Sequence, residues 1–133
     1  MTWNLSTQYE KRLVAAVIVA EAGGEGYKGM QAVAEVISQR SIEDHFTFAQ
    51  VVLDKRQFSC LNNVHHSDLV RRMSQRETFQ TALRIVGQME LKRLPGMTNK
   101  ANHFTRSSEK PSWAKKTKPV AIIGKHSFYR LKR

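Results

Sequence analysis

The stretch that decides the fold is VAEAGGEGYKG, residues 19–29, which overlaps the end of the apolar run LVAAVIVA at 13–20. A helical repeat of about 100° per residue brings Val14, Ile18 and Glu21 onto one face. The sequence therefore predicts a helix through this run that carries an acid at the end of its apolar face.

Glycines at positions 23, 24 and 26 interrupt the helical pattern directly after this acid. The first helix is expected to begin near Thr7 and to end near Ala20, and a second is expected to begin at Tyr27 or the next residue and to end at Arg40. The glycines expose the backbone, and Glu25 lies among them. We expect a helical hairpin whose tight corner holds both acids.

The rest of the chain predicts shorter elements. Thr47 can cap a short helix, FAQVVLDK, and a helical region of one or two helices begins at Ser67 or Asp68 and ends before Pro95. The runs NHFTR and VAIIG are rich in β-branched and aromatic residues, which favours small strands or ordered loops. The expected fold class is mainly α (α+β), and residues 1–133 are expected to form a single domain.

Glu21 can be an ordinary acid that points outward at the end of the helix, or its position on the apolar face can give it the properties that a general acid needs. A carboxyl group on an apolar face loses hydration, and this desolvation raises its pKa, so it can hold a proton near neutral pH. Protonation of a glycosidic oxygen needs such a group, because the leaving group is otherwise poor. Glu25 can be a second catalytic carboxylate, a partner that orients the first, or a simple surface acid.

The composition limits the classes of partner. Lys and Arg number 22 against 11 Asp and Glu, and the net charge of +11 favours a polyanion, either nucleic acid or the anionic polymers of a bacterial envelope. No segment is apolar and long enough to span a bilayer, and the amino terminus lacks the pattern of a signal peptide. If the protein, made in the cytoplasm, acts on an envelope, we therefore expect that another agent releases it.

Several runs together resemble a known family. AAVIVAEAGGEGYKGMQAVAEVISQR, QFSCLNN, ANHFTR, PSWA and IGKHSFYR are similar, in order and spacing, to the spore-cortex-lytic (SleB-like) cell wall hydrolase family. The resemblance covers about residues 12–130. It implies a lysozyme-like, lytic-transglycosylase-like helical domain that cleaves the glycan strands of peptidoglycan between N-acetylmuramic acid and N-acetylglucosamine.

The resemblance also implies roles for individual residues. The essential glutamate of the family corresponds to Glu21, and the second acid of its motif corresponds to Glu25. The positions that it assigns to the lining or support of the cleft are Gln57, Phe58, Ser59, His103, Phe104, His126, Phe128 and Tyr129. Trp113 can stack on a sugar ring or belong to the core. A short, strongly basic chain of this kind looks like a bacteriophage endolysin, for which a holin-type protein opens the membrane.

Other interpretations stay open. If Glu21 acts first as acid and then as base, the protein is a lytic transglycosylase, whereas attack by water makes it a lysozyme-type muramidase with Glu25 as base. An N-acetylmuramoyl-L-alanine amidase would need zinc, but His65 and His66 adjoin without a zinc motif, so no metal and no cofactor are expected.

A nucleic-acid-binding module is the alternative from a different class, and charge alone supports it. We expect a monomer whose partners are the peptidoglycan polymer and anionic envelope components.

Overall fold

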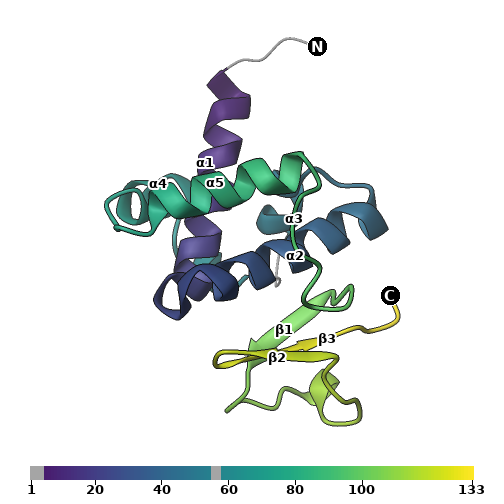
Figure 1. The fold of residues 1–133 in the computed structure, drawn as a ribbon. Helices are drawn as coiled ribbons and strands as arrows, with labels where there is room; N and C mark the ends of the chain where they lie inside the picture. The colour runs from purple at the N-terminus through teal and green to yellow at the C-terminus, as the bar shows by residue number, and fades with distance from the viewer. Residues whose placement is uncertain (1–4, 55–57) are drawn as a thin grey trace.

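The computed structural model describes residues 5–54 and 58–133, with only the backbone described for residues 5–7 (Figure 1). The helices are α1 (Leu5–Ala22), α2 (Gly26–Asp44), α3 (Phe48–Leu53), α4 (His66–Met73) and α5 (Phe79–Glu90), and the strands are β1 (His103–Arg106), β2 (Ala121–Ile123) and β3 (His126–Tyr129). Short 3₁₀ helices occur at η1 (Gly23–Glu25), η2 (Ser59–Leu61) and η3 (Ser112–Ala114). The predicted fold class, mainly α with a small β part, is confirmed.

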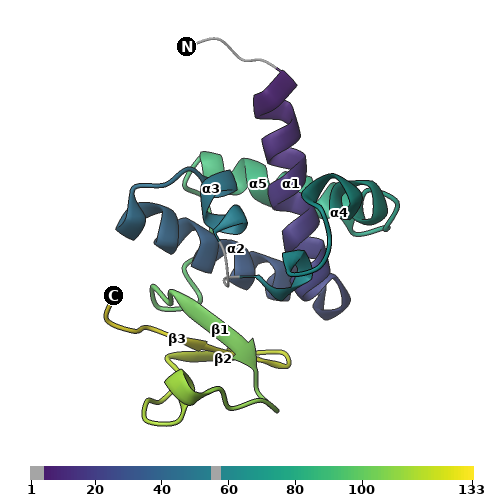
Figure 2. The same cartoon turned by 180° about the vertical axis from the view of Figure 1, so that it is seen from behind.

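Helix α1 runs through the middle of the helical part of the molecule (Figures 1 and 2). Residues 13–19 are all at most 3% exposed, because α2, α3, α4 and α5 pack around them. The prediction of a single apolar face is therefore too narrow, since this stretch is buried on every side. The helix becomes accessible again only at Ala20, next to Glu21.

The corner after α1 keeps the predicted order of elements, with η1 joining α1 to α2. Gly26 adopts φ +81°, a conformation that residues with a side chain rarely take. A Cβ on Gly29 would lie 2.7 Å from the Cβ of Glu25, so this turn also needs a glycine there. Helix α2 runs across α1 rather than back beside it, so the pair forms a crossed corner instead of the expected hairpin (Figures 1 and 2).

Two polar side chains of α2 are buried. The 3.6-residue pattern places Gln31 and Glu35 opposite the apolar stripe, yet they are only 7% and 8% exposed. Glu35 accepts hydrogen bonds from the backbone N–H groups of residues 96, 97 and 98 at 2.7, 3.1 and 2.9 Å, and from the hydroxyl of Thr98 at 2.8 Å. This carboxylate fastens the segment that leads into the sheet onto α2.

The shorter helices follow the sequence signals closely. Thr47 caps α3 as predicted: its hydroxyl accepts from the Gln50 N–H at 3.1 Å, and the Gln50 side chain accepts from the Thr47 N–H at 2.8 Å. The helical region that follows divides into α4 and α5, separated by a turn at residues 74–78. Helix α4 begins at His66, slightly before the predicted start.

The strands form one antiparallel sheet in the order β1-β3-β2. Strands β1 and β2 lie in the runs NHFTR and VAIIG, as the sequence favours, whereas β3 was not predicted. Strand β3 pairs with both neighbours, and its residue His126 lies opposite Arg106 of β1 and Ile123 of β2. Because side chains alternate along a strand, His126 and Phe128 share one face.

That face packs against helix α2. Phe128 is 1% exposed and forms a small apolar cluster with Ala32 and Val36 of α2 and with Ala101. In both ribbon views α2 lies between α5 and the sheet (Figures 1 and 2). Among the described residues, no helix combines the length and the apolar character that crossing a membrane requires.

Candidate active site

Glu21 lies in the last turn of α1, where the helix leaves the core. Val19 is buried, whereas Ala20 is exposed and Glu21 is partly buried. Burial raises the pKa of the Glu21 carboxyl, although hydrogen bonds from Cys60 and the electrostatic effects of His126 and Arg106 partly oppose the shift. The net upward shift favours the protonated form, which is the form a general acid needs.

Cys60, in η2, is the immediate partner of that carboxyl. Its thiol and its backbone N–H both donate hydrogen bonds to Glu21. Burial and the neighbouring Glu21 raise the pKa of the Cys60 thiol. The thiol therefore stays protonated, so it orients the carboxyl as a donor and is a poor nucleophile.

Two cavities meet at Glu21. The larger, of about 440 Å³, is called the aromatic cavity here, and its lining includes Glu21, Cys60, Asn62, Phe104, Trp113 and His126. The smaller, of about 220 Å³, is called the cationic cavity and is lined by residues 19–25 together with Arg76, Arg106 and Lys125. Ala20, Glu21 and Arg106 belong to both. A polymer that occupies both cavities would contact Glu21, because Glu21 lines each of them.

Glu25 is held by the turn between β2 and β3. One carboxylate oxygen accepts a hydrogen bond from the Lys125 backbone N–H at 2.7 Å, and the other contacts Nδ1 of His126. The side chains of His126 and Glu25 are only 6% and 15% exposed. An ionised carboxylate carries no hydrogen, so the His126 Nδ1 must be the donor.

The backbone of this turn is shaped around the same carboxylate. Gly124 adopts φ +58°, and a Cβ there would lie 2.6 Å from Oε1 of Glu25. The contact joins residues 100 positions apart in the sequence. The contact between Glu25 and the β2–β3 turn connects the helical corner that carries Glu21 to the sheet, which forms part of the wall of the aromatic cavity.

Aromatic side chains form the wall of the aromatic cavity on the sheet side. Phe104 and Trp113 line it, and Trp113 is 36% exposed. The ring of Tyr129 meets Trp113 edge-on at 5.3 Å, and the ring of Phe58 lies 6.2 Å from that of Phe104. Tyr129 and Phe58 are only 2% and 3% exposed, so they support the wall from behind.

Comparison with known families matches residues 24–129 to the family described as Cell Wall Hydrolase, a match that covers most of the chain. The chain belongs to the cell wall hydrolase family. No curated protein and no solved structure matches it. Membership in this family supports the degradation of peptidoglycan as its general activity. The matched segment begins three residues after Glu21, so the role of Glu21 rests on the geometry described above.

The cell wall hydrolase brings most of the predicted site residues to the two cavities that share Glu21, which together are called the groove. Those that line a cavity are Glu21, Glu25, Ser59, Phe104, Trp113 and His126. Phe58 and Tyr129 lie behind the wall, and Gln57 lies outside the described residues. The predicted roles of these residues stay predictions.

His103, like Phe58 and Tyr129, is a predicted site residue that lines neither cavity. Its Nδ1 lies 2.8 Å from Oδ1 of Asn102, and its ring centroid lies 5.1 Å from that of Trp113. Burial and the charges of Arg40 and Arg133 lower the pKa of His103 to about 4. His103 is therefore neutral near pH 7 and contributes to the support of the Trp113 loop.

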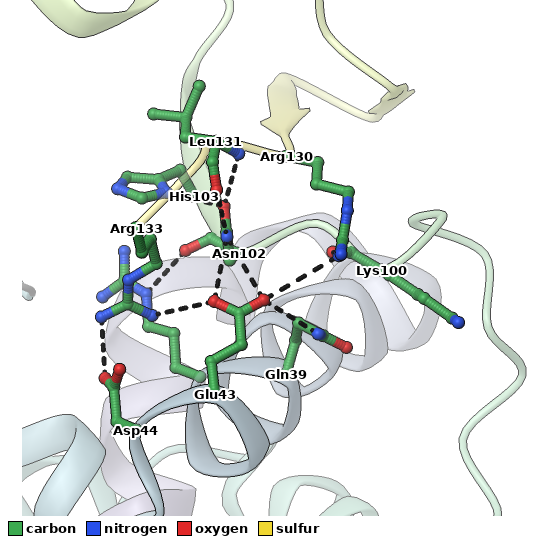
Figure 3. A network of polar contacts seen from close by, with 10 residues as sticks. Gln39, Glu43, Asp44, Lys100, Asn102, His103, Arg130, Leu131 and Arg133 are labelled. Atoms are coloured by element: carbon green, nitrogen blue, oxygen red, sulfur yellow. Dashed lines mark hydrogen bonds and ion pairs between the residues drawn. The ribbon is translucent and has the colours of Figure 1, made fainter.

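Asn102, beside it, is the centre of the polar network in Figure 3. Its side-chain amide donates to Glu43 at 3.1 Å and to the Leu131 carbonyl at 2.8 Å, and its backbone carbonyl accepts from Nε of Arg40 at 2.6 Å. Arg133 adds an ion pair to Glu43 at 3.4 Å. This network holds the end of α2 against the segment that precedes β1 and the segment that follows β3.

The cations of the groove are the functional candidates that the sequence pattern does not reveal. Arg76 comes from the turn between α4 and α5, Arg106 ends β1, and Lys125 lies in the turn before β3. Only Arg106 carries a sequence signal, because it lies two residues after Phe104 and so shares its face of the strand.

No group of three or more His, Cys, Asp and Glu side chains in the described part of the chain is arranged to hold a metal ion. The rings of His65 and His66 lie 4.2 Å apart, but neither lines the aromatic or the cationic cavity.

Proposed function

We propose that this cell wall hydrolase is a lytic transglycosylase that cuts the glycan strand between N-acetylmuramic acid and N-acetylglucosamine, with Glu21 as its acid and then its base. The observation that carries the proposal is the position of Glu21 where the two cavities join. A strand that lies through the groove exposes a bridging oxygen to a carboxyl whose pKa burial has raised.

The reaction follows from this position. Glu21 donates its proton to the bridging oxygen, the bond from C1 of the muramic sugar to that oxygen breaks, and positive charge develops at C1. The Glu21 carboxylate then takes the proton from the 6-hydroxyl of the same sugar while O6 bonds to C1. The products are a 1,6-anhydromuramic end and a new N-acetylglucosamine end, and no water is consumed.

Glu25 has a positioning role in this proposal. Its two oxygens bind the Lys125 N–H and the His126 ring, so neither is free to activate a water molecule. The contact holds the β2–β3 turn beside the groove, which keeps His126 and the side chain of Lys125 at the walls of the two cavities.

Muramidase-type hydrolysis is the second candidate, because one further carboxylate, Glu109, lines the aromatic cavity. Glu109 is exposed, and none of the ion pairs within residues 5–54 and 58–133 involves it. A second carboxylate in the same cavity as the acid could activate a water that attacks C1.

Mass spectrometry of fragments released from purified sacculi distinguishes the two routes. We expect anhydromuramic ends from the wild type and from E109Q, and no fragments from E21Q, whose circular dichroism should match the wild type. Reducing muramic ends that disappear in E109Q would show hydrolysis instead. Freed peptides with intact glycan strands would contradict both routes, as would full activity of E21Q.

We also propose how the enzyme reaches its substrate. It acts on the wall after another agent releases it from the cytoplasm, and its net charge of +11 draws it to anionic envelope polymers. The loss of turbidity of a cell-wall suspension should therefore slow several-fold as ionic strength rises from about 0.05 to 0.5 M, because the Debye length shortens. An unchanged rate would refute the role of charge.

A further inference from the structure

Positive side chains are concentrated in the lining of the cationic cavity. Arg76, Arg106 and Lys125 line it, and no ion pair among the described residues joins any of them to a carboxylate. Of the two acids on its wall, Glu25 is bound by the β2–β3 turn, and Glu21 is the partly buried acid with the raised pKa. The cavity therefore presents unneutralised positive charge directly beside Glu21.

The aromatic cavity, on the other side of Glu21, has a different chemistry. Its wall offers the exposed ring of Trp113 and the amide of Asn62, and there the carboxylate of Glu109 accompanies Arg106, the cation that both cavities share. The ring and the amide are the groups that this cavity alone provides. A flat ring and an amide suit an uncharged sugar, which stacks its C–H face and hydrogen-bonds through its acetamido group. They give no preference for an anion.

The two sugars of peptidoglycan differ in the same way as the two cavities. N-acetylglucosamine is uncharged, whereas the lactyl group of N-acetylmuramic acid carries a peptide with free carboxylates. Guanidinium and ammonium groups are the side chains that bind carboxylates through charge-assisted hydrogen bonds. A strand that crosses Glu21 thus finds a suitable cavity for each sugar.

We propose that the cationic cavity binds the carboxylates of the peptide attached to muramic acid, with Arg76 and Lys125 as the recognition residues. This inference rests on the proposed glycan-cleaving function and adds the direction of the strand. The muramic sugar lies on the cationic side of Glu21 and N-acetylglucosamine on the aromatic side, so the bond from C1 to the bridging oxygen lies over the acid.

Arg76 and Lys125 are suited to test this assignment separately from catalysis. Both belong to the cationic cavity alone, whereas Arg106 lines both cavities and acts electrostatically on Glu21. Both side chains are exposed and come from turns, so R76Q and K125Q remove charge without removing a core contact. The variant R84Q/K118Q is the matched control, because it removes the same charge from two exposed positions that line neither cavity.

The test compares R76Q/K125Q with the wild type and R84Q/K118Q on two soluble glycan substrates. One carries peptides with free carboxylates, and the other carries the same peptides with every carboxylate amidated. We expect R76Q/K125Q to raise KM about tenfold on the first substrate, which is the effect of losing two exposed ion pairs, and to leave kcat nearly unchanged. On the amidated substrate it should match the wild type, and the control should match it on both.

An equal change on both substrates, or the same change in the control, would overturn the assignment. Failure of the proposed function gives a different result, since the wild type would then release no glycan fragments from either substrate.

Binding can be followed independently of cleavage by NMR titration of labelled E21Q with N-acetylmuramyl-L-alanyl-D-glutamate and with its amidated form. The amide signals of Arg76 and Lys125 should shift with the carboxylate form alone. Their failure to shift would refute the carboxylate site whether or not the protein cuts glycan.

Discussion

Replacing Glu25 with alanine should break the connection between the helical corner and the sheet. The carboxylate accepts hydrogen bonds from the Lys125 N–H and the His126 ring in a largely buried site. A hydrogen bond to a charged group contributes about 1.5–3 kcal/mol, and removing one partner leaves the other buried and unpaired. We expect E25A to lower the free energy of unfolding by about 3–5 kcal/mol and Tm by roughly 10–20 °C.

Denaturant unfolding followed by circular dichroism measures this loss. E25Q keeps one acceptor for the Lys125 N–H and should fall between the wild type and E25A. E77A is the control, because Glu77 is exposed and takes part in none of the ion pairs of the described residues, so its change should stay within about 0.5 kcal/mol. If E25A unfolds within about 1 kcal/mol of the wild type, the contact does not hold the two parts together, and the positioning role is wrong.

Three further predictions concern other parts of the fold. Burial raises the pKa of Glu21, so the stabilising contribution of this group is present below the unfolded pKa and is lost as pH rises through the folded pKa. E21Q should therefore be more stable than the wild type at pH 7. Unfolding measured over a range of pH should show this difference disappear in acid. G124A should lose at least about 1–2 kcal/mol of stability in denaturant unfolding, because φ at this position is positive and the added Cβ would meet Glu25. G87A, where a helix has open space for the Cβ, should gain about 0.5–1 kcal/mol. Equal effects of the two substitutions would refute the close fit of the β2–β3 turn around Glu25. The pKa of His103 is lowered to about 4, so His103 should make stability fall as pH drops from about 6.5 towards 4, and it should have no such effect above pH 6.5. An NMR titration of His103 with a midpoint near 4 would confirm the cause. A midpoint near 6.5 would contradict the burial of this side chain.

Local signals in the sequence predict the helical part of this fold well. Thr47 and Gln50, which form the capping box, lie only three positions apart, so the sequence alone is enough to find it. The position of Glu21 at the end of an apolar run follows from helical periodicity in the same way. The buried Gln31 and Glu35 do not follow, because their partners, Gln88 and residues 96–98, lie about 60 positions away.

The sheet and the cations of the groove depend on such distant contacts even more. The four residues HSFY of β3 are too short and too polar to indicate a strand, and the strand is buried because it pairs on both sides. Arg76 and Lys125 lie in two different turns, and only the folded chain brings them to the same cavity. Residue patterns therefore predict the acid, whereas the groove around it follows from tertiary structure.

The strand order has a consequence for synthesis on the ribosome. Strand β3 lies between β1 and β2 but follows both in the sequence, so neither has its partner until residues 126–129 have emerged. The helices can pack earlier, with Glu21 already in place but with no opposite wall. A nascent chain halted before His126 should thus be largely helical and should lack the sheet-side wall of the aromatic cavity.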